Sequence, residues 1–339
     1  MINETIYNIL ITLIKIVVVL SVAMLHVALA VYCERKVIGH MQRRMGPMEV
    51  GPKGILQSFA DVIKLFFKED IVPTAADKPL FYIAPIIGLA ATMASLSVVP
   101  FFDGFAIANI RVGLLFLFAM SSLGAYAVIL AGWASNSKYS FLGGMRSSAQ
   151  VISYEVTMGL SLVGVMIMAE SLNLNDIVWA QQSYPTRLYL IPQFIGFFVF
   201  ILSAMAETNR VPFDLPEAEQ ELVAGYFTEY SGMRFALFFL AEYIGMFAMS
   251  SIAVVCFLGG WALPRFVYHM FTGSTILISV LEVFYFLFKL YMCLFFYYWA
   301  RATLPRYRYD QLMSLAWKVL IPLAVVNILI TGTIKMFVK

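Results

Sequence analysis

The sequence predicts an all-α, polytopic membrane protein with eight transmembrane helices and an amphipathic interfacial helix on the cytoplasmic side. Of its 339 residues, 61% are hydrophobic and 13% are charged, whereas soluble domains carry about 25% charged residues. The apolar residues form runs of about 20, the length that crosses a bilayer as a helix. Because no internal repeat is visible, we interpret residues 1–339 as a single membrane domain.

Eight apolar runs are the expected transmembrane helices. They cover 8–31, 80–101, 111–133, 148–170, 188–206, 234–260, 276–299 and 315–337. The first run is too long for the hydrophobic region of a signal peptide, and no small-residue cleavage site follows it. An even number of crossings places both termini on the same side of the membrane.

The basic residues indicate which side that is. Two of the 23 lysines and arginines lie inside runs, and the side of the termini has only Arg111, Arg187, Arg265, Lys335 and Lys339. The others lie in or beside the loops 33–79, 134–147, 207–233 and 301–314. Loops rich in lysine and arginine stay in the cytoplasm. We therefore expect these loops to be cytoplasmic and both termini to be periplasmic.

Residues 54–68, in the first cytoplasmic loop, have the pattern of an amphipathic helix. Gln57, Asp61, Lys64 and Lys68 fall on one face, and the other face carries Ile55, Leu56, Phe59, Val62, Ile63, Phe66 and Phe67. Such a helix is too polar to span a bilayer but suits its interface. Considered alone, the pattern favours a helix that merely covers the ends of neighbouring helices. The charged segment 34–44 beside it favours a place where an apolar ligand with a polar head could bind.

Carboxylates are concentrated between residues 206 and 230, where Arg210 is the one base. The acids are Glu207, Asp214, Glu217, Glu219, Glu221 and Glu229. A solvated loop explains such a charge run about as well as an ion path does. Asp214 and Pro216 suit the start of a helix. In that helix Glu217 and Glu221 would share one face and Glu219 another. Like charges at such spacing raise each other's pKa, so the cluster could form a proton reservoir.

Other charged residues lie within the apolar runs, where each costs about 2.5–3.5 kcal/mol on insertion scales. Glu155 lies in the fourth run, whose helix also carries a stripe of polar residues. Glu242 lies inside the sixth run. Glu282 and Lys289 share one face of the seventh. Pairing between helices would explain these last two as well as a function would, whereas the polar stripe makes Glu155 the stronger functional candidate.

The sequence argues against several other classes of function. A net charge of +3, without basic residues interleaved with aromatics, does not indicate nucleic-acid binding. Cys33, Cys256 and Cys293 lie far apart and lack the spacing of metal ligands. Without a cysteine cluster or a G-x-G-x-x-G turn, we expect no metal, iron–sulfur or nicotinamide site in this chain.

Four long segments, in the same order, resemble the H subunit of bacterial NADH-quinone oxidoreductase (complex I), the counterpart of mitochondrial NADH dehydrogenase subunit 1. They read E-R-K-V-I-G-H-M-Q-R-R-M-G-P at 34–47, G-W-A-S-N-S-K-Y-S-F-L-G-G-M-R-S-S-A-Q-V-I-S-Y-E-V at 132–156, A-E-T-N-R-V-P-F-D-L-P-E-A-E-Q-E-L at 206–222 and R-A-T-L-P-R-Y-R-Y-D-Q-L-M at 301–313. The resemblance covers essentially the whole chain. It departs from the family pattern at His40 and Met48, where arginine and asparagine are common.

The resemblance implies a membrane subunit of a proton-translocating enzyme in the bacterial inner membrane. Its partners would be the other complex I subunits, which carry the flavin and iron–sulfur clusters, together with membrane lipid. Its substrate would be quinone, reduced in a chamber that this chain helps to form. By resemblance, the proton-coupling residues are Glu34, Asp61, Glu155, Glu207, Asp214, Glu217, Glu219 and Glu221, and the quinone chamber includes Arg35, Arg43 and Arg301.

Two alternatives to this interpretation remain at the level of sequence. One is the homologous membrane subunit of a ferredoxin- or F420-dependent complex or of a membrane-bound hydrogenase. The complete first-loop and E-A-E-Q-E-L motifs favour the quinone enzyme. The other is an autonomous ion-coupled transporter, and the lack of an inverted repeat argues against it.

The distribution of basic residues makes a topological prediction. Cysteines placed at Lys64 and Glu219 should be cytoplasmic, and one placed at Arg187 should be periplasmic. A membrane-impermeant thiol reagent added to intact cells should therefore label position 187 and spare the other two. The reverse pattern of labelling would contradict the orientation.

Overall fold

The computed structural model describes residues 2–183, 188–215, 222–270 and 275–338, and their regular structure is helical throughout. The α-helices are α1 (Ile2–Met41), α2 (Gln57–Phe67), α3 (Lys78–Ser95), α4 (Gly113–Ala134), α5 (Lys138–Ala169), α6 (Leu174–Ser183), α7 (Phe194–Glu207), α9 (Gly232–Phe257), α10 (Arg265–Met270), α11 (Thr275–Thr303), α12 (Tyr309–Leu315) and α13 (Ile321–Val338). Short helical turns are η1 (Pro52–Gly54), η2 (Leu96–Val98), η3 (Gly225–Phe227) and η4 (Ala316–Leu320). The predicted all-α class is confirmed.

Seven helical segments among the described residues are long and apolar enough to cross a membrane. They are Ile6–Met41, Lys78–Val98, Gly113–Ala134, Lys138–Ala169, Gly232–Phe257, Ile276–Thr303 and Tyr309–Phe337. Each contains or overlaps a run predicted from sequence. The remaining predicted run, 188–206, is helical only from residue 194, where the 14-residue helix α7 begins. Residues 189–193 form turns instead, because Pro192 disfavours a helical conformation at the residue before it.

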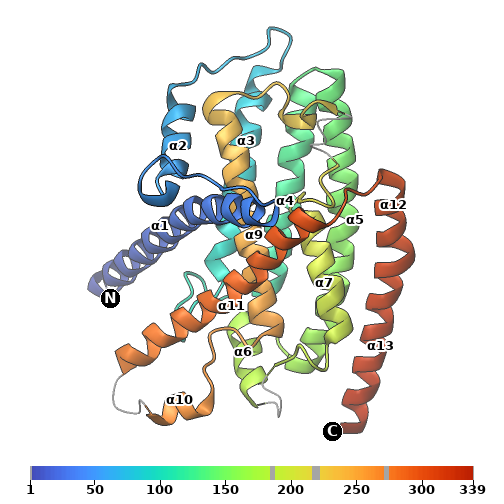
Figure 1. The fold of residues 1–339 in the computed structure, drawn as a ribbon. Helices are drawn as coiled ribbons and strands as arrows, with labels where there is room; N and C mark the ends of the chain where they lie inside the picture. The colour runs from blue at the N-terminus through green and yellow to red at the C-terminus, as the bar shows by residue number, and fades with distance from the viewer. Residues whose placement is uncertain (1, 184–187, 216–221, 271–274, 339) are drawn as a thin grey trace.

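The helices form a bundle whose centre is α9 (Figure 1). Helix α3 packs against α4 and α9, and α5 packs against α4 and α7. Helices α1 and α11 cross the bundle obliquely and contact both α9 and each other, while α13 lies along α5 and α7 (Figure 1). Of the apolar window of α9, 83% is buried within the protein, so this helix organises the others.

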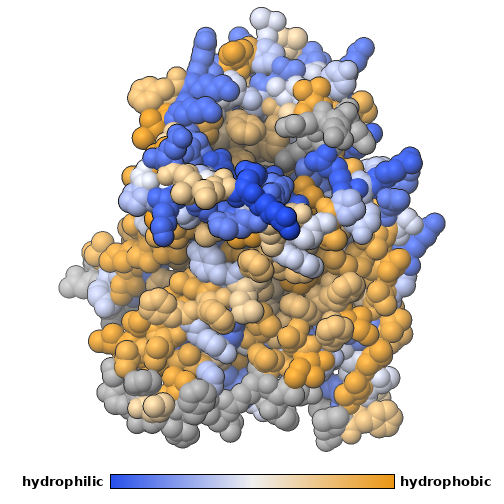
Figure 2. Space-filling view, in the orientation of Figure 1, coloured by the Kyte–Doolittle hydropathy of each residue, from blue (hydrophilic) through white to orange (hydrophobic). Residues whose placement is uncertain are grey.

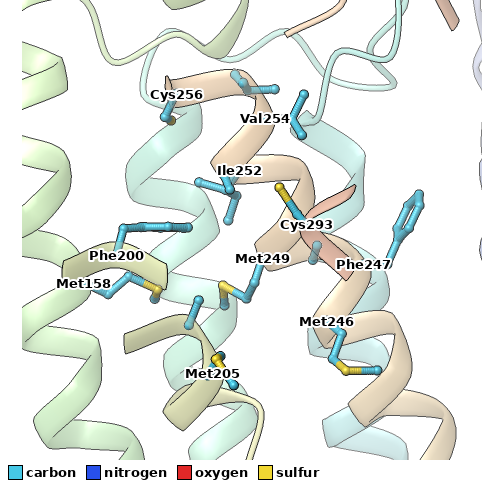
Figure 3. Packing of buried hydrophobic residues seen from close by; sticks show 14 of the residues in the cluster. Met158, Phe200, Met205, Met246, Phe247, Met249, Ile252, Val254, Cys256 and Cys293 are labelled. Atoms are coloured by element: carbon cyan, nitrogen blue, oxygen red, sulfur yellow. The ribbon is translucent and has the colours of Figure 1, made fainter. Parts of the chain in front are cut away.

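Long, flexible apolar side chains fill the space around α9. Figure 3 shows Met158 of α5 and Phe200 and Met205 of α7 near Met249 and Ile252 of α9, all of them buried. The unbranched methionine side chain adapts to irregular gaps. In a membrane, helices associate through this kind of close packing rather than through exclusion of water.

The outer surface divides into a polar end and an apolar body. On the face seen in Figure 2, hydrophilic residues gather over the upper part of the molecule, where the loop after α1 lies, and apolar residues dominate below. The apolar side chains of α2 also face outward, among them Phe59, Ile63 and Phe67, which is 88% exposed. Helix α2 thus occupies most of the segment predicted to be amphipathic, and the described residues of the chain leave its apolar face exposed.

Close backbone approaches hold α5 against its neighbours. A Cβ atom on Gly143 would lie 2.6 Å from the Cα of Gly225 in η3, well inside the normal contact distance. A Cβ on Gly144 would lie 3.2 Å from the Cα of Gly132 in α4. Small residues at these positions let the helix backbones meet.

Gly143→Ala should therefore destabilise the protein by about 1–3 kcal/mol, because the backbone of η3 must move to admit a methyl group. The measurement is the free energy of unfolding in a denaturing-detergent titration. Gly332→Ala is the matched control, because a Cβ at this position in α13 meets no atom within 4 Å. Equal stability of the two variants would contradict the packing argument.

Candidate functional site

Charged side chains from four parts of the chain meet in the protein interior. Glu34 comes from α1, Arg210 from the segment after α7, Glu242 and Tyr243 from α9, and Arg301 from α11. Arg210 Nη1 lies 3.2 Å from Glu34 Oε1, and its Nε lies 2.6 Å from Glu242 Oε1. Arg301 also pairs with Glu34. We call these five residues the charge network.

The network compensates charges that would otherwise be costly to bury. The Tyr243 hydroxyl donates to Glu34 Oε2 over 2.8 Å, and the Arg210 guanidinium lies 4.2 Å from the Tyr243 ring centre. Burial alone would lower the pKa of Arg210, but Glu242, Tyr243 and Glu34 together raise that pKa well above its usual value. Arg210 is therefore a permanent cation, and removing either carboxylate would leave charge unbalanced.

A second pair of acids lies against α4. Ser121 donates a hydrogen bond of 2.5 Å to Glu207, the last residue of α7, and Ser122 donates one to Glu155 of α5. Since the two serines are adjacent in the sequence, one turn of α4 holds both carboxylates near each other. The hydroxyl groups supply the donors that a carboxylate needs away from water.

A cavity of about 120 Å³ extends from the charge network to this second pair. Glu242 and Glu207 both line it, together with Ser121, Thr208 and Asn209. That volume holds several water molecules, and the polar lining provides the two to four partners that each ordered water requires. Glu242 of the charge network and Glu207 of the second pair thus reach the same cavity, although most of its lining is apolar.

Arg35 and Asp61 form a third charged pair, closer to the surface. Arg35 Nη1 donates to Asp61 Oδ2 over 2.6 Å and so connects the end of α1 to α2. Gln57 also donates to Asp61, over 3.1 Å. Arg43 lies exposed in the turn after α1, with a positive φ of 54°. The structure thus places Arg301 in the network, Arg35 beside it in sequence, and Arg43 outside it.

The acidic segment after α7 is only partly described. Asp214 Oδ2 accepts a hydrogen bond of 2.9 Å from Arg306 in the last loop. Burial raises the pKa of Asp214 above its usual value, and the nearby Arg306 opposes that shift. Glu217, Glu219 and Glu221 lie outside the described residues, as does most of the helix predicted to start at Asp214.

Glu282 and Lys289, both in the seventh predicted run, have partners outside the charge network. Lys289 donates to the carbonyl oxygens of Leu258 and Gly260, over 2.7 and 2.9 Å, and so caps the end of α9. Glu282 accepts a hydrogen bond of 2.9 Å from Tyr268. Within the described ranges, no three His, Cys, Asp or Glu side chains converge in a way that could hold a metal ion.

Sequence reasoning did not assign Glu242, Tyr243, Ser121 and Ser122 to the site. Glu242 had a usable signal, since an acid inside an apolar run is rare unless it is paired. Its partner Arg210 is 32 positions away, and only the fold shows that they meet. The serines had no such signal, because small hydroxyl residues are common wherever membrane helices pack.

The fold and the site together define a multi-pass membrane protein with a charge-compensated series of buried acids. Residues 14–332 match the family model of NADH dehydrogenase. The chain therefore belongs to the NADH dehydrogenase family, and the resemblance predicted from the four motifs is confirmed.

Bacterial relatives named as H subunits of NADH-quinone oxidoreductase are similar over most of the chain. The protein is 51% identical to the one from Rhodospirillum centenum, over 90% of this chain and 88% of the relative. It is 51% identical to the one from Brevibacillus brevis, over 95% and 92%. It is 47% identical to the H subunit numbered 2 in Koribacter versatilis, over 95% and 96%.

The geometry predicts that Arg210→Met will destabilise the protein by about 3–5 kcal/mol, because it leaves Glu34 and Glu242 buried without their shared cation. Arg308→Met is the control. Arg308 pairs with Asp310 on the surface, where both side chains are more than three-quarters exposed, and such a pair contributes at most about 1 kcal/mol. Thermal unfolding of the purified chain in detergent compares the two. An Arg210 variant as stable as the Arg308 variant would contradict the argument.

Proposed function

We propose that this chain, as the H subunit of an NADH-quinone oxidoreductase, joins the membrane arm to the peripheral arm, forms much of the quinone-reduction chamber and begins the acidic path that couples quinone reduction to proton translocation. The observation that carries the proposal is the sharing of Arg210 by Glu34 and Glu242. Because both carboxylates pair with the same cation, a change in the charge of one alters the electrostatic interactions of the other.

The path we propose starts near the surface and ends within the bundle. It runs from Asp61 and Arg35 through the charge network, across the cavity to Glu207, and on to Glu155. Support comes from the Arg35–Asp61 pair, the ion pairs of Arg210, the cavity between Glu242 and Glu207, and the adjacent serines that hold Glu207 and Glu155. Asp214, Glu217, Glu219 and Glu221 would act as a proton reservoir beside it.

The quinone chamber is proposed where polar and apolar surfaces adjoin. Arg301 is 40% exposed although its partner Glu34 is buried, so it can face a ligand and the network together. The outward apolar face of α2 suits the quinone tail, and Arg35 and Arg43 at the end of α1 suit its polar head. Electrons would come from the flavin and iron–sulfur clusters of partner subunits.

This arrangement provides coupling through charge. Reduction of quinone to quinol consumes two electrons and two protons, and the protons come from acids next to the chamber. Each proton that leaves the network makes a carboxylate more negative, which strengthens its attraction to Arg210 and Arg301. The added negative charge raises the proton affinity of Glu242, so protons are drawn across the cavity from Glu207 toward the network.

In the bacterial inner membrane, we propose that α7 and its preceding turns form an eighth crossing. Both termini would then be periplasmic, the loops at 33–79, 134–147, 207–233 and 301–314 would be cytoplasmic, and α2 would lie in the interface. The asymmetry of basic residues supports this orientation. Membrane lipid would contact the exposed apolar faces of the outer helices.

The experiment is Glu242→Gln in the assembled enzyme, which keeps the size and hydrogen bonding of the side chain but removes its charge. Quinone reduction and proton pumping should fall together by tenfold or more, while NADH oxidation by an artificial acceptor at the flavin remains normal. Glu217→Gln/Glu221→Gln should act similarly, with effects that do not add because the acids titrate together.

Glu170→Gln is the matched control, because this acid is 66% exposed and pairs with Lys335 at the opposite end of α5. It should leave both activities unchanged. Normal quinone-linked pumping in an assembled Glu242→Gln enzyme would reject the acidic path.

A further inference from the structure

A single glutamine of α5 holds both ends of the segment that carries Arg210. This segment, residues 207–212, begins at the last residue of α7, and we call it the Arg210 loop. The side-chain amide nitrogen of Gln150 donates to the carbonyl oxygens of Ala206 and Phe213, each over 2.8 Å. These two residues flank the loop on either side. Since a side-chain amide has two hydrogens, Gln150 uses both of them to fasten the loop at its two ends.

The neighbouring turns of α5 contact the same segment. Asn209 Nδ2 donates to Ser147 Oγ over 3.4 Å, and the ring centre of Tyr154 lies 5.8 Å from that of Phe213. Positions 147, 150 and 154 are spaced by three and four residues, so they lie on one face of the helix. Gln150 is fully buried there, with 0% exposure. Bulk water therefore cannot replace its two hydrogen bonds if the amide is removed.

The Arg210 loop carries two groups of the proposed acidic path. Glu207 begins it and lines the cavity, and Arg210 pairs with Glu242 over 2.6 Å. The Arg210 carbonyl accepts a hydrogen bond of 2.7 Å from the N–H of Phe213, whose own carbonyl Gln150 holds. A displacement at this end of the loop therefore reaches the backbone of Arg210 directly. The position of the guanidinium at the ion pairs depends on the position of that backbone.

We propose that Gln150 is a positioning residue of the acidic path, which sets the Arg210 guanidinium between Glu34 and Glu242 by fixing the Arg210 loop. The inference rests on the proposed function of the charge network. Because the Gln150 side chain is uncharged and does not titrate, its effect passes through the groups that it positions. Helix α5 then contributes to the path twice, with Glu155 as an acid and with Gln150 as the support of Arg210.

The first test is Gln150→Met in the assembled enzyme in membranes. Methionine has a similar length but no donor, so the carbonyls of Ala206 and Phe213 lose their shared partner and the loop can shift. The kcat of quinone reduction and the rate of proton pumping should fall together by about tenfold, with the KM for quinone changed by less than about twofold, because small misplacements of reacting groups lower the rate rather than ligand binding. Flavin-site activity with an artificial acceptor verifies assembly.

Gln181→Met is the matched control. Gln181 of α6 is also fully buried, and it also bonds to the backbone of another segment. Its amide nitrogen donates to the Val255 carbonyl over 2.6 Å, and its Oε1 accepts from the Gly259 N–H over 2.9 Å. These partners lie at the C-terminal end of α9, whereas Glu242 lies in the first half of that helix. The control therefore removes a comparable buried amide and should leave both rates unchanged.

A double variant separates positioning from a general loss of structure. If Gln150 acts through the pairing of Arg210 with Glu242, Gln150→Met should lower the rates little further in a Glu242→Gln background. A defect that is merely structural would be independent of that ion pair, so the two reductions in rate would multiply.

An assembled Gln150→Met enzyme as active as Gln181→Met would overturn the inference, and so would reductions that multiply in the double variant. Should Gln150→Met fail to assemble, Gln150→Asn decides. It keeps an amide but is one methylene shorter and cannot reach both carbonyls, so its kcat should fall with KM kept, and an unchanged kcat would overturn the inference. Normal pumping in Glu242→Gln rejects the acidic path itself, whereas impaired Glu242→Gln with normal Gln150 variants rejects only the positioning role.

Discussion

Burying two carboxylates beside each other requires an opposite charge between them, and Arg210 meets that constraint in this protein. Its guanidinium lies between Glu34 of α1 and Glu242 of α9, with the ring of Tyr243 against it. Arg301 of α11 completes the balance at Glu34. Three helices are thus held in register by one set of ion pairs, and no member can change charge without affecting the others.

The short helix α7 is what brings Arg210 to this position. Its 14 residues extend about 21 Å, less than the hydrocarbon thickness of a bilayer. The irregular segment that follows is buried, with Thr208, Asn209 and Arg210 each less than 9% exposed. Its backbone is satisfied locally, since Arg210 N–H donates to the Met205 carbonyl over 3.2 Å and Phe213 N–H to the Arg210 carbonyl over 2.7 Å. Irregular backbone is tolerated within a membrane protein only where protein surrounds it in this way.

Local patterns predicted local features of this fold, and pairings between distant residues had to come from the structure. The apolar periodicity of residues 54–68 predicted α2 well, because that pattern needs only neighbouring residues. The motifs of the family pointed to Glu34 and Arg301 but not to the contact between them. Lys289 illustrates the difference: a carboxylate partner was a reasonable expectation, whereas the end of α9 supplies carbonyl oxygens instead. The length of α7 was overestimated because hydropathy counts apolar residues without registering the turn at Pro192.

The unequal exposure of Arg301 and Glu34 has a consequence for speed. The side chain of Arg301 is 40% exposed, whereas that of its partner Glu34 is 4% exposed. An anion at the outer surface would therefore compete with Glu34 for the Arg301 guanidinium. Side-chain rotamers of exposed groups change in picoseconds to nanoseconds, whereas collective helix motions take microseconds or longer. A side-chain response of Arg301 to a ligand at the outer surface would therefore alter the electrostatic environment of Glu34 before any helix moves.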